Sequence, residues 1–67
     1  MSNDENGILS PNFGKVVKAR LVELGKTHVW LMRELGISRQ YFYDILDGKR
    51  QANAQRLRMF QILGIKA

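Results

Sequence analysis

The sequence contains no cysteine, one proline and one histidine among its 67 residues. The absence of cysteine excludes disulfide bridges and thiolate metal sites, and a lone histidine leaves no conventional zinc site. No apolar run is long enough to span a bilayer, and the polar, acidic amino terminus is unlike a signal peptide. We therefore expect a single cytoplasmic domain with no metal, no cofactor and no membrane partner.

The sequence also lacks the groups of residues on which catalysis depends. It contains no nucleophile–base set, no carboxylate pair and no phosphate-cradling glycine loop. A chain of 67 residues also leaves little room for a pocket beside its core. We expect a protein that is not an enzyme and has no small-molecule substrate.

Basic residues are in clear excess, with 11 Lys and Arg against 6 Asp and Glu and a formal net charge of +5. Two of the acids, Asp4 and Glu5, lie near the amino terminus, so the remainder has 11 basic and 4 acidic residues, a net charge of +7. Such a surplus favours an anionic partner, nucleic acid or a membrane surface. A merely soluble basic protein would have the same composition.

The pattern of apolar residues predicts a flexible tail over residues 1–10 and one all-α domain of four helices over residues 11–67. The apolar stripes of the four helices are Phe13, Val17, Leu21 and Leu24; Leu31 and Leu35; Phe42 and Ile45; and Leu57, Phe60 and Leu63. The expected N-caps are Asn12, Thr27, Ser38 and Asn53, and the expected stop signals are Gly25, Gly36, Gly48 and Gly64. No strand pattern is present.

The segment from Thr27 to Leu46 predicts two helices of about eight residues joined by a three-residue turn. Gly36 supplies the positive φ of the turn, Ile37 fills the angle between the helices, and Ser38 caps the second helix. This arrangement is typical of a helix-turn-helix, whose second helix lies in the major groove of DNA.

Four short stretches occur in the order GKTH, LGIS, DILDGKR and LGI. Because of these stretches and their order, residues 13–65 resemble the Cro/cI-type (XRE family) helix-turn-helix domains of phage repressors and bacterial regulators. The resemblance implies a small lambda-repressor-like fold and sequence-specific binding to double-stranded DNA in transcription regulation, with an origin in a phage or other mobile element. Such domains usually act as two-fold homodimers on DNA. We expect the recognition helix to run from about Arg39 to Leu46.

The resemblance also assigns roles to individual residues. It implies base reading by Arg39, Gln40, Tyr43 and Asp44, and phosphate binding by Thr27, His28, Lys49 and Arg50. The chemistry agrees, because arginine can bond guanine O6 and N7 together and glutamine can bond adenine N6 and N7. Asp44 could accept from a cytosine amino group or keep a nearby arginine in position.

Three positions depart from the family pattern. Met32 stands where alanine is usual, Trp30 replaces an exposed polar residue, and the apolar pair Leu21 and Leu46 replaces a buried Arg–Glu pair. The alternative function is a small module that binds and modulates another regulator protein, with Tyr43 among its aromatic anchors. Candidate protein contacts are Trp30, Tyr41, Met59 and Ile62, while Arg56 and Arg58 are interpreted as the solvated face of the last helix.

Overall fold

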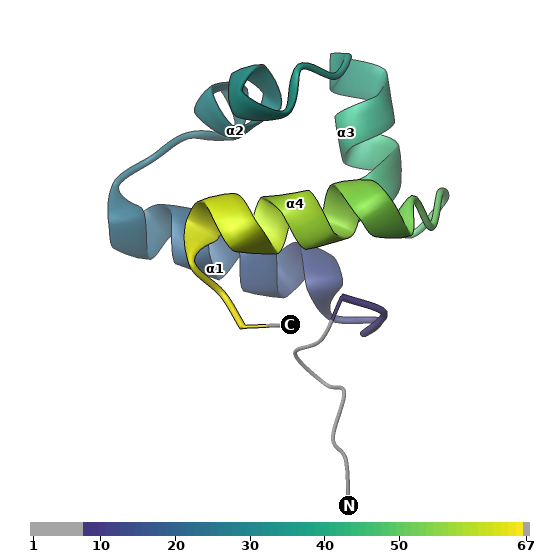
Figure 1. Ribbon diagram of the computed structural model, residues 1–67, viewed down its shortest axis with the longest axis horizontal. Helices are drawn as coiled ribbons and strands as arrows, with labels where there is room; N and C mark the ends of the chain where they lie inside the picture. Colours follow the sequence, from purple (N-terminus) through teal and green to yellow (C-terminus); the bar gives the residue numbers. More distant parts are fainter. Residues whose placement is uncertain (1–7, 67) are drawn as a thin grey trace, which may run out of the picture.

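The computed structural model describes residues 8–66, which form four helices (Figure 1). These are α1 (Phe13–Leu24), α2 (His28–Leu35), α3 (Arg39–Leu46) and α4 (Asn53–Leu63). The described part of the chain contains no strand, so the prediction of a small all-α domain of four helices is confirmed. None of these helices has both the length and the apolar character needed to cross a membrane.

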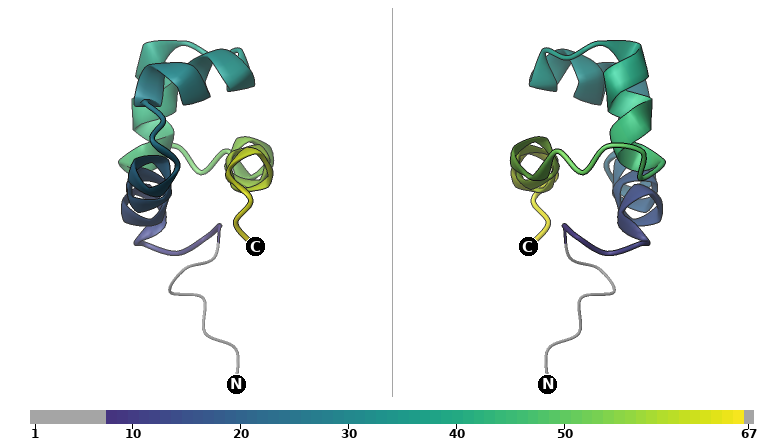
Figure 2. Two further views of the ribbon diagram at one scale, coloured as in Figure 1. Left: turned by 90° about the vertical axis from the view of Figure 1, so that its left-hand side faces the viewer. Right: turned by 90° about the vertical axis from the view of Figure 1, so that its right-hand side faces the viewer.

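The helices surround one core, and α1 and α4 each pack on two other helices. Helix α4 lies along α1 and also contacts α2, and α3 packs on α1 (Figure 1). Viewed end on, α4 lies to one side of the layer that contains α1 and α3, and α2 crosses at the end of the molecule opposite α1 (Figure 2). This arrangement leaves one side of α3 without a helical neighbour.

Local chemistry sets the ends of α1 and α2 and the starts of α2 and α3 as predicted. Gly25 and Gly36 both adopt the left-handed conformation at the ends of α1 and α2. The hydroxyl of Thr27 accepts a hydrogen bond from the Trp30 amide at 3.1 Å, and the hydroxyl of Ser38 accepts one from the Tyr41 amide at 3.2 Å. These caps satisfy amides that a helix start otherwise leaves without partners.

The predicted cap position of α1 is confirmed at Asn12, whereas the predicted cap of α4 at Asn53 is wrong. Asn12 precedes α1 but its side chain accepts no cap bond, and the Ser10 hydroxyl accepts from the Asn12 amide at 2.9 Å instead. At α4 the cap position is Ala52, with φ of 42°, and Asn53 is already helical. Ala52 packs against the core, and this tertiary contact outweighs the local preference of asparagine for the cap.

The core consists of eleven buried apolar side chains drawn from all four helices. The stacked rings of Phe13 and Phe60, with centroids 5.3 Å apart, join α1 to α4. Leu21 of α1 and Leu46 of α3 are both buried. The full set is Phe13, Val17, Leu21, Leu31, Leu35, Phe42, Ile45, Leu46, Met59, Phe60 and Leu63.

The inward face of α4 differs from the predicted one. Arg56 and Met59 are buried, at 7% and 0% exposure, whereas Leu57 is 39% exposed. Residues 56, 59, 60 and 63 form a stripe with helical spacing, so α4 is rotated to place Arg56 where the prediction placed Leu57. The prediction also fails at Leu24, which is 39% exposed at the end of α1.

Arg56 is the residue that connects α4 to two distant segments. Its Nη1 donates to the Ile8 carbonyl at 2.8 Å and its Nη2 to the Arg50 carbonyl at 3.3 Å, while its guanidinium lies 4.8 Å from the centroid of the Phe13 ring. Ile8 packs against the core and Ser10 is buried. Residues 8–10 of the expected tail therefore lie against the helices, and residues 1–7 lie outside the described residues.

A close approach between α1 and the end of α3 occurs at Gly14. A Cβ atom added to Gly14 would lie 2.6 Å from the Leu46 carbonyl oxygen, which belongs to the backbone. No side-chain rotation can relieve such a contact, so glycine is required for the two helices to approach this closely.

We expect Gly14→Ala to lower the free energy of unfolding by about 1–3 kcal/mol, since overpacking outweighs the better helix propensity of alanine. Urea denaturation checks this value. Lys18→Ala, at an exposed position of the same helix, is the control and should change it by less than about 0.5 kcal/mol. Equal stability of Gly14→Ala and the unaltered chain would contradict the close approach.

We expect Arg56→Met to lower the free energy of unfolding by about 1–3 kcal/mol, because the Ile8 and Arg50 carbonyls lose their charged donor. The matched control is Arg58→Met, which removes the same charge from an exposed position of α4 and should have an effect below about 0.5 kcal/mol. If both variants unfold alike, the burial of Arg56 contributes nothing to stability.

Candidate nucleic-acid interface

Helix α3 has two faces of opposite character. Phe42, Ile45 and Leu46 are buried against the core. The opposite face begins with Arg39 and Gln40, which are exposed, and one turn later comes to Tyr43 and Asp44, which are partly buried. The four side chains that the sequence predicts as base readers thus share one face of one helix.

The turn before α3 determines how this face is presented. Gly36 has φ of 69° and its amide donates to the Met32 carbonyl at 2.8 Å, so α2 stops and the chain changes direction at once. Ile37 is partly buried and packs against the core, which agrees only in part with the fully buried position expected for it. Met32 also packs there, so a flexible side chain is accommodated where α2 meets the core.

Arg39 lies beside the ring of Tyr43, one turn further along α3. The guanidinium carbon is 5.9 Å from the ring centroid, within the range of a cation–π contact. The Tyr43 ring in turn contacts Phe42 and His28, with centroids 5.3 and 5.9 Å away. Tyr43 therefore supports an exposed arginine from a position that is itself packed.

Asp44 has a partner for each of its carboxylate oxygens. Its Oδ1 accepts from Nε2 of Gln40 at 2.8 Å, and its Oδ2 lies 3.7 Å from Nε of Arg50. The carbonyl of Asp44 also accepts from the amides of Lys49 and Arg50 at 2.9 and 3.2 Å. Because its side chain is only 17% exposed, Asp44 is better placed to hold Gln40 and Arg50 than to reach outward.

The loop after α3 carries the cations Lys49 and Arg50, and both are exposed. Arg50 bridges two residues of α3, since its guanidinium pairs with Asp44 and its guanidinium carbon lies 5.6 Å from the centroid of the Tyr41 ring. The loop is thereby held beside the outward face of α3. Its positive charge adjoins the side chains of that face.

The two residues predicted to bind phosphate at the start of α2 differ in accessibility. Thr27 is exposed, although its hydroxyl already caps α2. His28 is partly buried with its ring against Phe42 and Tyr43, and its Nε2 is buried without a hydrogen-bond partner in the described structure. An anion at this end of α2 would therefore meet the backbone amides and Thr27 more readily than Nε2 of His28.

Sequence reasoning missed Lys26, which precedes the cap of α2. Its Nζ lies 5.2 Å from the centroid of the Trp30 ring, and the side chain is exposed. Helical spacing does not predict this contact, because Lys26 precedes the extended cap residue Thr27 and lies outside α2. Lys26 adds a positive charge at the start of α2, beside Thr27.

The predicted protein contacts are less accessible than expected. Met59 is a fully buried core residue, so its predicted role as a surface contact is wrong. Trp30, Tyr41 and Ile62 are partly buried against the core. Among the large apolar side chains of α1 and α2, the most exposed are instead Val22 and Val29, at 80% and 51%.

The chain was compared with models of protein families, with curated proteins and with solved structures, and none of them matches it.

Proposed function

We propose that the protein is a sequence-specific regulator of the Cro/cI type, which binds double-stranded DNA with α3 in the major groove. The observation that supports this most directly is the outward pair Arg39 and Gln40 at the first turn of α3, opposite the buried face and beside the cations of the following loop. A helix that enters the major groove of DNA reads bases with the residues at its amino-terminal end.

The hydrogen-bonding groups of this pair suit the purine edges of the major groove. Arg39 has a forked donor that matches O6 and N7 of guanine. One N–H of the Gln40 amide is occupied by Asp44, which leaves its second N–H and its Oε1 for the N7 and N6 positions of adenine. In this proposal Asp44 is a positioning residue that orients the Gln40 amide, and Tyr43 supports Arg39.

The cations on either side of α3 suit the phosphate backbone. Lys49 and Arg50 follow the helix, and Lys26 and Thr27 precede α2. Contacts of these residues with phosphates would add affinity without sequence preference, and that part of the affinity falls with added salt.

Selection of binding sites from random double-stranded DNA with the purified chain tests the proposal. We expect an enriched sequence that contains a guanine and an adenine close together, and two copies about one helical turn apart if the protein binds as a two-fold dimer. Absence of enrichment, together with absence of retardation of DNA in a gel, would contradict the proposal. It would favour the alternative of a module that binds another regulator.

Arg39→Ala and Lys49→Ala should affect DNA binding differently. We expect Arg39→Ala to weaken specific binding by about 1–3 kcal/mol and to relax the preference at one base position. Lys49→Ala should weaken binding to all sequences alike and lower the slope of log K against log salt by about one unit. Lys18→Ala on α1 is the control for loss of a positive charge. An unchanged base preference in Arg39→Ala would refute its role as a base reader.

Asp44→Asn should reduce the ratio of specific to non-specific affinity by up to roughly tenfold, since the charge-assisted bond to the Gln40 amide becomes a weaker neutral one and Arg50 loses its carboxylate. Non-specific affinity should not fall, because the variant carries one negative charge fewer. Asp47→Asn makes the same change of charge at an exposed position of the loop. Equal specificity ratios in the two variants would show that Asp44 orients no base reader.

A further inference from the structure

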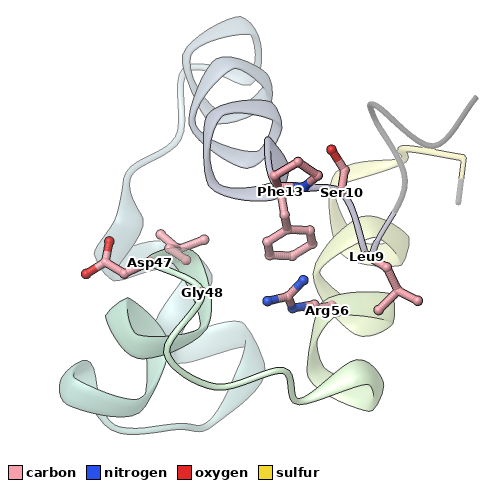
Figure 3. A pocket seen from close by; sticks show the side chains of 8 residues that line it. Leu9, Ser10, Phe13, Asp47, Gly48 and Arg56 are labelled. Carbon is pink, nitrogen blue, oxygen red and sulfur yellow. The ribbon is translucent and has the colours of Figure 1, made fainter.

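A pocket of about 270 Å³ lies between the segment that precedes α1 and the loop that follows α3 (Figure 3). Its walls combine apolar and polar groups from three parts of the chain, with Arg56 of α4 as the cationic residue. The apolar side chains are Leu9, Pro11, Phe13 and Leu46. A pocket of this size was not expected in so short a chain.

The Arg56 guanidinium is an unusual group to find in such a pocket. It is 93% buried, given its exposure of 7%, yet it forms no ion pair within residues 8–66. A guanidinium has five N–H donors, and the bonds to the carbonyls of Ile8 and Arg50 occupy two of them. Its Nε is buried without a partner in the described structure. Buried charges are normally paired, so this cation has unused capacity to bind an anion.

The other polar residues of the pocket do not neutralise this charge. Asp47 is the one acidic residue that lines it, and its carboxylate points away from Arg56 on the far side of the opening (Figure 3). Asp47 is exposed, and its charge is therefore hydrated and screened. Ser10 is buried and takes part in other contacts. The positive charge of Arg56 thus dominates the interior of the pocket.

We propose that this pocket binds a small carboxylate with a compact apolar body, whose carboxylate pairs with Arg56 and whose body contacts Phe13 and Leu46. A cavity of about 150 Å³ is large enough to hold benzene, so 270 Å³ accommodates a six-membered ring together with a carboxylate. The planar fork of arginine suits a carboxylate, and the four apolar side chains of the wall offer a ring contacts that phosphate cannot make. The binding site is separate from the outward face of α3.

Titration of the full 67-residue chain with benzoate in the absence of DNA tests the proposal. Amide chemical shifts in heteronuclear NMR spectra should change around Phe13, Gly48 and Arg56, with a dissociation constant of roughly 1 mM. Benzamide, the neutral analogue, and inorganic phosphate should each bind at least about tenfold more weakly. No saturation by about 20 mM benzoate, or equal binding of benzamide or phosphate, would overturn the proposal.

Two variants of an exposed residue at the pocket separate binding from folding. Leu9 is 56% exposed, so Leu9→Glu and Leu9→Gln should both leave the fold intact. The glutamate places a carboxylate beside Arg56 and should weaken benzoate binding by about tenfold relative to the glutamine variant. Arg56→Met should abolish the preference for benzoate over benzamide wherever it folds. Equal benzoate affinity in the two Leu9 variants would overturn the proposal, whatever the result of the DNA experiments.

Discussion

The burial of one guanidinium, that of Arg56, determines how α4 sits in the fold. Removing an arginine from water costs several kcal/mol unless other groups replace its hydration, and here two carbonyls and the face of Phe13 do so. Those groups come from the segment before α1, the loop after α3 and α1 itself, so none of these can shift without exposing the charge. The rotation of α4 follows from this contact. With Arg56 inward, Met59 and Phe60 enter the core and Leu57 faces solvent.

The ends of the helices were predictable because local chemistry determines most of them. A glycine with positive φ ends α1 and α2, and a hydroxyl cap begins α2 and α3. The face of α4 was not predictable in the same way. Two sets of residues in its sequence have helical spacing, namely 57, 60 and 63, and 56, 59, 60 and 63. The general rule that arginine stays in water favours the first set, whereas the second set is buried. The burial of Arg56 depends on a hydrogen bond to the Ile8 carbonyl, 48 residues away in the chain, and no local sequence pattern predicts such a contact.

The candidate interface was predictable as a set of residues but not as an arrangement. The spacing along α3 was enough to put Arg39, Gln40, Tyr43 and Asp44 on one face, since residues three and four apart are neighbours on a helix surface. The same spacing also predicts the contacts within this set, because Gln40 and Asp44 are four residues apart, as are Arg39 and Tyr43. The contacts of Arg50 could not be predicted from spacing, because they depend on how the loop folds back over α3.

Arg50 links the outward face of α3 to the interior of the molecule. Its amide and its guanidinium are both held by Asp44, and its carbonyl accepts from Arg56. Arg50 is therefore held on one side by Asp44 of α3 and on the other by Arg56 of the pocket. The bond of Arg56 to the Arg50 carbonyl, at 3.3 Å, is the longer of its two main-chain bonds. The position of the loop that carries Lys49 and Arg50 therefore depends on Arg56. The Arg56 guanidinium donates a hydrogen bond to this loop and is also buried with the core residues of α4.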